Sequence, residues 1–276
     1  MAELDSWFLD NLVCLVEKVP LTYKNGTLIS NAGREYFVVH DIPVMLRSDI
    51  EATLHVATSS IARASGNKSI IDKRAPDLYL ETLGMDDAEK QLAANIYSNS
   101  AYSVDPVVQG MIGATSGYAY RNLIGENILR EYPIPNISLS TGNGQHLLDI
   151  GCNWGRWSVA AARKGYVSVG IDPSLGAIMA TRRVARQLGL PNRYVVADAR
   201  ELPFKNGVFD VTYSYSVLQH LSKNDVKTAL VEVCRVLKNS GLSRIQMAHR
   251  IGVRSLQHQI RRQFREPRGF RSGIGV

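Results

Sequence analysis

Three acidic residues and a glycine turn have the types and spacing to do chemistry. The segment LLDIGCNWGRWSVAA (147–161) passes from an apolar run through Asp149 into a turn with Gly151 and Gly155. Asp172 and Asp198 each follow a later apolar run. Glycine lets a ligand approach the backbone closely, and a carboxylate accepts hydrogen bonds from hydroxyl and amino groups. Such a turn can cradle a dinucleotide, another nucleoside, or no ligand at all.

The turn does not fit the dinucleotide-binding fingerprint. That fingerprint needs glycine at its first, third and sixth positions. Counting from Gly151, the third position is Asn153 and the sixth is Arg156. An arginine fits poorly where helix and strand must pack closely, so the spacing disfavours a nicotinamide cofactor.

From residue 146 onward, strand-like and helix-like segments alternate. The apolar runs predict strands at 146–151, 168–172, 193–198, 209–217 and 243–248. Apolar residues at helical spacing predict helices at 157–165, 174–189 and 222–241, the last with Ser222 and Asp225 in capping-box spacing. This alternation is typical of an α/β fold, a doubly wound and mostly parallel sheet whose ligands bind beyond the carboxyl ends of the strands.

The earlier part of the chain is organised differently. Residues 10–46 alternate strand-forming and turn residues, and Asn25-Gly26 is a strong hairpin signal. Residues 51–135 are mainly helical in pattern, and Pro133, Pro135 and a polar stretch form a linker. We therefore expect a small β unit at 1–50, a helical cap and linker at 51–145, a core at 146–250, and a basic amphipathic helix and tail at 251–276.

The core segments, taken in order, resemble the class I S-adenosylmethionine-dependent methyltransferases, most closely the methyltransferase type 11 group. The resemblance covers residues 146–250. It rests on the Asp149, Gly151, Gly155 turn, on VVADARELPF around Asp198, on FDVTYSYSVLQHL (209–221) and on EVCRVLKNSGL (232–242), with Asp172 ending the second strand. The turn departs from the usual family pattern, because Asn153 stands where another glycine is common. Asparagine visits left-handed backbone angles readily, so the turn can survive this change.

The resemblance implies a Rossmann-like methyltransferase fold with S-adenosyl-L-methionine as cofactor. It implies that Asp172 accepts hydrogen bonds from the ribose hydroxyls, that Asp198 receives the adenine amino group, and that the Ala199 amide meets a ring nitrogen. The cofactor-binding residues that we expect in the core are Asp149, Gly151, Cys152, Asn153, Gly155, Asp172, Pro173, Asp198, Ala199 and Ser214.

A segment before the core, SGYAYRNLIG (116–125), resembles the helix that closes over the methionine end of the cofactor in many of these enzymes. Gly117, Tyr118, Tyr120 and Arg121 are candidates there, and Tyr118 and Arg121 are expected to bind the cofactor. Arg121 can pair with the methionine carboxylate.

His220 is the candidate catalytic residue. It follows the fourth strand, where the family often places a residue facing the acceptor, and an imidazole can serve as a general base. Packing at the start of the next helix is the alternative role. Side chains alternate between the two faces of a strand, so Tyr213 and Tyr215 share one face at the strand end, and Ser214 and Ser216 share the other. Either pair can line the cleft.

The first 50 residues resemble a small zinc-ribbon-like domain found fused to some methyltransferases, including RNA-modifying ones. LDNLVC (9–14) and GREYFVVHDIPVML (33–46) carry this resemblance. Structural zinc needs four ligands, and of the usual two cysteine pairs only Cys14 is present. We expect no metal, and a role in docking or lid formation.

The amino-acid composition bears on the compartment in which the protein resides and on the partners that it binds. Three widely separated cysteines argue against a disulfide framework, and no apolar run is long enough to span a membrane, so we expect a cytoplasmic protein. The net charge is +7, but residues 250–276 carry a net +6 of it. Nucleic acid is therefore a possible partner that the charge distribution does not favour.

After the fifth strand, the sequence offers one amphipathic helix and no room for the hairpin that ends the family's seven-stranded sheet. We expect a truncated sheet, impaired turnover and possible self-association through the exposed fifth strand. The sequence predicts a methyltransferase acting on a small molecule such as a sugar, lipid or secondary metabolite. The alternatives are an RNA methyltransferase or its accessory subunit, and a donor-binding protein without activity.

Overall fold

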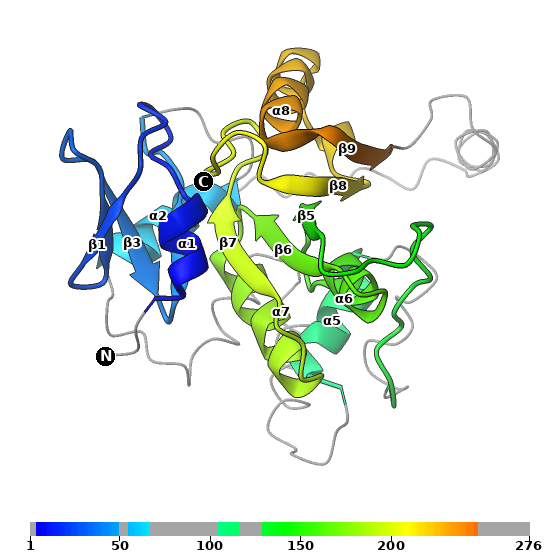
Figure 1. Ribbon diagram of the computed structural model, residues 1–276. Coiled ribbons are helices and arrows are strands. Elements are labelled where there is room, and N and C mark those ends of the chain that lie inside the picture. Colours follow the sequence, from blue (N-terminus) through cyan, green and yellow to red (C-terminus); the bar gives the residue numbers. More distant parts are fainter. Residues whose placement is uncertain (1–3, 50–54, 67–103, 116–128, 248–276) are drawn as a thin grey trace, which may run out of the picture.

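The computed structural model describes residues 4–49, 55–66, 104–115 and 129–247. Within these ranges the strands form one sheet, whose spatial order is β1-β2-β3-β4-β7-β6-β5-β8-β9. Figure 1 shows the N-terminal strands (blue) at one end of this sheet and β8 and β9 (yellow and orange) at the other. The strands are β1 (Thr22–Lys24), β2 (Thr27–Ile29), β3 (Glu35–Val39), β4 (Ile42–Met45), β5 (His146–Ile150), β6 (Val167–Asp172), β7 (Arg193–Ala197), β8 (Phe209–Tyr215) and β9 (Leu237–Gln246).

The strands from β5 through β9 pair in parallel, as the alternation in the sequence predicts, and β4 joins them by pairing in parallel with β7. Strand order runs from β5 through β6 to β7 on one side and from β8 to β9 on the other, so it reverses between β5 and β8. Ligand sites in such sheets lie beyond the carboxyl ends of the strands at this reversal. The helices that connect and flank the strands are α1 (Ser6–Asn11), α2 (His55–Gly66), α5 (Pro106–Thr115), α6 (Arg156–Arg163), α7 (Leu175–Gln187), η4 (Leu218–His220) and α8 (Lys223–Val236).

The N-terminal strands extend the central sheet. The predicted hairpin is confirmed, since Asn25 and Gly26 adopt φ values of 51° and 78° between β1 and β2. The last strand of this unit, β4, then pairs in parallel with β7 through Val44 and Met45. Leu12, Leu28 and Met45 share one buried core with sheet residues such as Val169 and Val195, so the unit is packed into the domain that carries the site.

The thiol of Cys14, for which no zinc is expected, is buried beside polar side chains. Cys14 donates a hydrogen bond to Glu17 and lies 3.2 Å from the hydroxyl of Tyr36. Glu17 also pairs with Arg34 at 2.8 Å. Among the described residues, no group of three or more His, Cys, Asp or Glu side chains is arranged to hold a metal ion. The resemblance of this unit to a zinc ribbon stays a prediction.

The end of α8 differs from the expectation. The sequence pattern placed it at Gly241, but the helix ends at Val236 and β9 begins at Leu237. The reason is tertiary: Leu237 pairs with Phe209 of β8, and Lys238 forms an ion pair with Asp210 at 2.8 Å. The helix start was predicted correctly, because Ser222 caps it through the amide of Asp225.

Two helices of the expected cap region pack against the core. Ser60 of α2 donates to the carbonyl of Pro173 at 2.8 Å and accepts from the amide of Leu175 at 2.9 Å. Asp105, just before α5, pairs with Arg183 of α7 at 2.7 Å. The expected closing helix at 116–125 and the expected helix and tail at 251–276 lie outside the described residues. No described helix combines the length and the apolar character that crossing a membrane requires.

Candidate functional site

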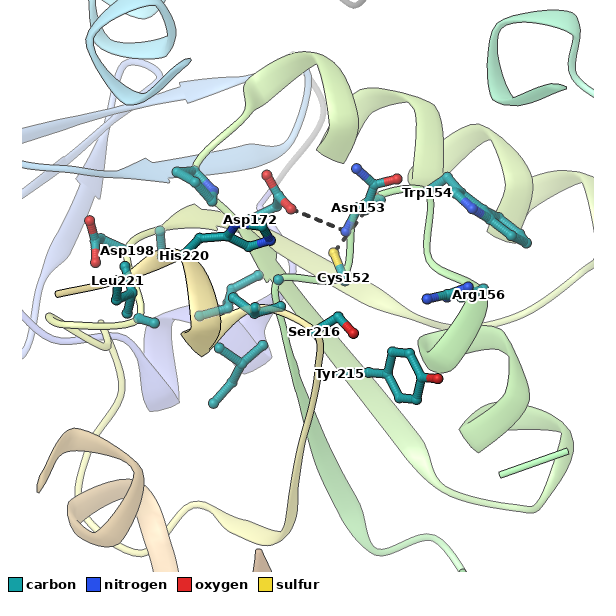
Figure 2. Close-up of a pocket in the computed structure, with 17 residues that line it drawn as sticks. Cys152, Asn153, Trp154, Arg156, Asp172, Asp198, Tyr215, Ser216, His220 and Leu221 are labelled. Atoms are coloured by element: carbon teal, nitrogen blue, oxygen red, sulfur yellow. Dashed lines mark hydrogen bonds between the residues drawn. The ribbon is translucent and has the colours of Figure 1, made fainter. Parts of the chain in front are cut away.

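A cavity of about 270 Å³ lies at the carboxyl ends of β5, β6, β7 and β8. This volume is near the lower end of the range of roughly 300 to 1,000 Å³ for small-molecule sites. Figure 2 shows its lining side chains. The wall consists of Ile150, Gly151, Cys152, Asn153, Trp154, Arg156, Ile171, Asp172, Pro173, Ala197, Asp198, Ala199, Tyr215, Ser216, Val217, His220 and Leu221. The cavity therefore sits where the strand order reverses.

The glycine turn between β5 and α6 has backbone angles that need its residue types. Gly151 and Gly155 have φ values of 71° and 85°, and Asn153 has φ 50°. A Cβ atom on Gly155 would lie 1.8 Å from the Oγ1 atom of Thr181, and one on Gly151 would lie 2.4 Å from Val217. The two glycines thus allow α7 and the loop after β8 to approach the turn, and Asn153 supplies the left-handed conformation predicted for it.

Asp172 joins the turn to the cavity wall. Its two carboxylate oxygens accept hydrogen bonds from the amides of Asn153 at 3.1 Å and Ser174 at 2.9 Å. Burial raises the pKa of Asp172 to about 6, because a desolvated carboxylate is less favourable than a neutral one. Each carboxylate oxygen has about two acceptor positions, so one on each oxygen is left for hydroxyl donors of a ligand.

Asp198 lies in the same wall and is already engaged by Arg200. The guanidinium of Arg200 donates to both carboxylate oxygens of Asp198, at 2.8 and 3.0 Å, and the amide of Arg200 donates at 2.8 Å. Arg200 also reaches Asp225 at 3.2 Å. Three of about four acceptor positions on Asp198 are used, which leaves one for a single N–H donor. Ala199 and Leu221 supply apolar surface beside it.

Asp149 and Ser214 stand behind the wall. Asp149 is 1% exposed and accepts a hydrogen bond from the hydroxyl of Ser158 at 2.7 Å. Burial raises the pKa of Asp149 to about 6. Ser214 is also 1% exposed, and its hydroxyl has no protein partner in the described part of the chain. Neither residue lines the cavity, so any effect of Asp149 on a ligand acts through the position of the turn.

The end of β8 resolves the choice between tyrosine and serine faces. Tyr213 packs against Trp157 with ring centroids 5.0 Å apart and does not line the cavity, whereas Tyr215 and Ser216 both do. The alternation of side chains between the two faces stops here, because the strand ends at Tyr215 and Ser216 adopts a φ of 59°. Two hydrogen bonds to Gln246 of β9, each 2.9 Å long, hold Ser216 there.

The remaining predicted residues are placed as follows. His220 lies in the wall at the end of η4 and is exposed. Cys152 and Pro173 also line the cavity. Tyr118 and Arg121 lie outside the described residues. Together, the cavity unites predicted residues from four strand ends and from the glycine turn.

The sequence did not identify Arg156 as a site residue. It used this arginine only as a reason to disfavour a dinucleotide cofactor. Arg156 lines the cavity together with Trp154 and Val217. The available signal was its position directly after the second glycine of the turn, at the first residue of α6. A residue that directly follows a ligand-binding turn is expected to lie near the ligand.

The core of this chain is similar to known methyltransferase domains. Residues 147–241 match the family of methyltransferase domains. The match agrees with the fold and cofactor expected from the sequence: a Rossmann-like methyltransferase domain whose cofactor is S-adenosyl-L-methionine. The free acceptor positions of Asp172 and Asp198 fit the ribose hydroxyls and amino group of this cofactor.

Relatives share this core over part of their length. An uncharacterized methyltransferase of Synechocystis is 30% identical over 136 residues, which cover 49% of this chain and 61% of that protein. A ubiquinone biosynthesis O-methyltransferase of Rhizobium etli is 32% identical over 99 residues, covering 36% of this chain and 39% of that protein. The crystal structure of the PH0226 protein from Pyrococcus horikoshii aligns with a TM-score of 0.39 and 27% identity, covering 44% and 52% of the two chains. The chain thus spans less than two thirds of the length of these relatives.

Proposed function

We propose that this chain is a methyltransferase that transfers the methyl group of S-adenosyl-L-methionine to a hydroxyl group of a small molecule. The observation that carries the proposal is the cavity at the strand reversal, where the glycine turn, Asp172 and Asp198 share one wall. The match of residues 147–241 to methyltransferase domains supports the reaction class. An O-methyltransferase among the relatives supports an oxygen acceptor.

The residues of the cavity have separate roles in the proposed reaction. The cofactor supplies a methyl group on a positively charged sulfur, which is a good leaving group. Asp172 would hold the ribose hydroxyls, and the turn from Gly151 to Gly155 would hold the cofactor beside it. Such positioning can supply on the order of 7 to 11 kcal/mol of the barrier. His220 would accept the hydroxyl proton of the acceptor as a general base.

The N-terminal unit has a supporting role in this proposal. Arg47, just after β4, forms an ion pair with Glu201 at 2.7 Å, three residues beyond Asp198. Together with the pairing of β4 and β7, this contact holds the loop that carries Asp198 and Ala199. Cys14 lies in the apolar core that this unit shares with the central sheet, and this packing would stabilise the unit.

Cofactor binding is tested by calorimetry with S-adenosylhomocysteine. Asp172→Asn should weaken binding about 30-fold, because two hydrogen bonds to a charged acceptor become bonds to a neutral one, at about 1 kcal/mol each. Asp10→Asn, on the exposed side of α1, is the control and should bind like the wild-type chain. Because Asp172 also accepts two backbone amides, the melting temperature of each variant must be measured. Equal affinities of Asp172→Asn and wild type would remove Asp172 from the cofactor site.

Methyl transfer is tested with radiolabelled S-adenosyl-L-methionine against a panel of hydroxylated small molecules. For an acceptor that is methylated, His220→Gln should lower kcat by about 10²- to 10⁴-fold, since a positioned general base contributes that much. Its affinity for S-adenosylhomocysteine should stay within about threefold. An unchanged kcat would exclude His220 as the base. Cofactor binding without transfer to any panel member would contradict the proposed acceptor class.

A further inference from the structure

The charged side chains of the cavity wall are separated by sign. Asp172 and Asp198 supply the carboxylates of the wall, and Arg156 supplies a guanidinium. Figure 2 shows Asp198 and Arg156 at opposite sides of the lining, with Asp172, Cys152 and Ser216 between them. A ligand that matches this arrangement carries hydrogen-bond donors at one end and a negative charge at the other.

Arg156 is held in place while its donors are left available. Its guanidinium carbon lies 5.1 Å from the ring centroid of Tyr215 and 5.5 Å from that of Trp157, close enough for cation–π attraction to both. Within the described part of the chain, the guanidinium makes no hydrogen bond and no ion pair with protein. Other arginines of the core, such as Arg183 and Arg200, are paired with aspartates. Arg156 therefore presents a preorganised fork of N–H donors beside the cavity.

The backbone at Arg156 adds to the positive potential. Arg156 is the first residue of α6, and the residue before it, Gly155, offers no side-chain oxygen to cap the helix. The first amides of a helix have no partner within the helix and carry partial positive charge. This end of the cavity thus favours an anion through both the side chain and the helix start.

We propose that Arg156 binds the carboxylate of the amino-acid end of S-adenosyl-L-methionine. This inference rests on the proposed function. The cofactor has two ribose hydroxyls and an amino group at its nucleoside end, which match Asp172 and Asp198, and a carboxylate at its other end, which matches Arg156. Arginine and carboxylate form paired, charge-assisted hydrogen bonds. The family resemblance offered Arg121 as a candidate for this carboxylate, and Arg121 lies outside the described residues.

The test compares two ligands that differ only at the end that Arg156 is proposed to bind. S-adenosylhomocysteine carries the amino-acid group, and 5′-methylthioadenosine keeps the adenine, ribose and sulfur but lacks the amine and carboxylate. Calorimetry on the full chain should show that Arg156→Gln weakens S-adenosylhomocysteine binding 10- to 100-fold and changes 5′-methylthioadenosine binding less than twofold. Arg156→Lys, which keeps the charge and loses the fork, should fall between Arg156→Gln and the wild type.

A matched control lies on the same helix. Arg163→Gln, in the last turn of α6 and exposed, should leave both affinities unchanged. Raising the salt concentration should weaken S-adenosylhomocysteine binding more in the wild type than in Arg156→Gln, because the pair is ionic. The Arg156→Lys variant keeps the cation–π contacts, so it provides a folded protein if Arg156→Gln is unstable.

Several outcomes would overturn the inference. Equal losses for the two ligands would mean that Arg156 shapes the cavity without binding the carboxylate. An unchanged affinity for S-adenosylhomocysteine, together with a raised KM for the acceptor, would assign Arg156 to an anionic group on the acceptor. If the wild-type chain bound neither ligand, the proposed function itself would fail, which is a different result from a failure confined to Arg156.

Discussion

Replacing Asp149 with asparagine should flatten the pH dependence of stability between about pH 4 and pH 6. Asp149 is 1% exposed, and burial raises its pKa from 3.8 to about 6. The hydroxyl of Ser158, which donates to Asp149 at 2.7 Å, can donate equally to the oxygen of an amide. Asparagine therefore keeps the shape and the hydrogen bond while removing the ionisable group.

The magnitude follows from the change in pKa. One pKa unit corresponds to about 1.4 kcal/mol, so a rise of about two units corresponds to about 3 kcal/mol. Between pH 4 and pH 6 the folded chain binds more protons at this site than the unfolded chain does. The stabilisation is therefore present below about pH 4 and is lost as the pH rises through 6. Asp172, whose pKa is also raised to about 6, should contribute a similar loss in the same range.

Other carboxylates act in the opposite direction and at lower pH. The guanidinium of Arg47 lowers the pKa of Asp49 to about 2, and the pKa of Asp210 and Asp225 is lowered as well. Stability that depends on these groups is present above about pH 4 and is lost as the pH falls through their folded-state pKa. Burial also lowers the pKa of His146 from 6.5, so this group adds stability as the pH rises near the upper end of the range, and Asp149→Asn leaves that contribution unchanged.

Urea unfolding followed by circular dichroism at pH 4.5, 5.5, 6.5 and 7.5 measures this effect. The difference in unfolding free energy between Asp149→Asn and the wild type should move in favour of the variant by about 2 kcal/mol between pH 4.5 and pH 7.5, because at pH 4.5 part of the full linkage has already been lost. Asp10→Asn, on the exposed side of α1, should follow the wild-type profile. If Asp149→Asn loses as much stability with rising pH as the wild type does, the carboxyl group of Asp149 does not titrate in this range.

Two further predictions concern the backbone around the cavity. Gly155→Ala should lower the free energy of unfolding by at least about 2 kcal/mol, because φ is +85° and the new Cβ would lie 1.8 Å from Oγ1 of Thr181. Adding Thr181→Ala should recover part of this loss in urea unfolding, and no recovery would refute the steric explanation. Ser216→Ala should cost about 1 kcal/mol through the lost hydrogen bond to Gln246. Ser216→Gly should cost less, because glycine relieves the positive φ of 59°, and the reverse order of stability would contradict this account.

Local patterns were enough to predict much of the domain. The Asn25-Gly26 hairpin and the Ser222 cap depend on residues within a few positions of each other, so their conformations follow from neighbouring side chains and backbone angles. The same holds for the alternation of apolar runs and helical spacing that defines the core. Asp172, Asp198 and His220 were placed at the cavity because the carboxyl ends of parallel strands share one edge.

Contacts between distant parts of the chain decided the rest. The pairing of β4 with β7 and the end of α8 at Val236 depend on partners far away in the sequence, which no local pattern encodes. The left-handed turn at Ser216, held by Gln246, brought both Tyr215 and Ser216 into the wall where the alternation of side chains between the two faces predicted only one of them.

The sequence by itself determined the class of domain, the glycine turn and the acids that follow the strands, because these depend on residue type and short spacing. Only the tertiary structure decided which of those side chains reach the cavity. Asp149 lies behind the wall with Ser158, whereas Arg156 lies in it, stacked near Tyr215. The physical reason is that the direction and solvation of a side chain depend on everything packed around it, and most of those neighbours are remote in sequence.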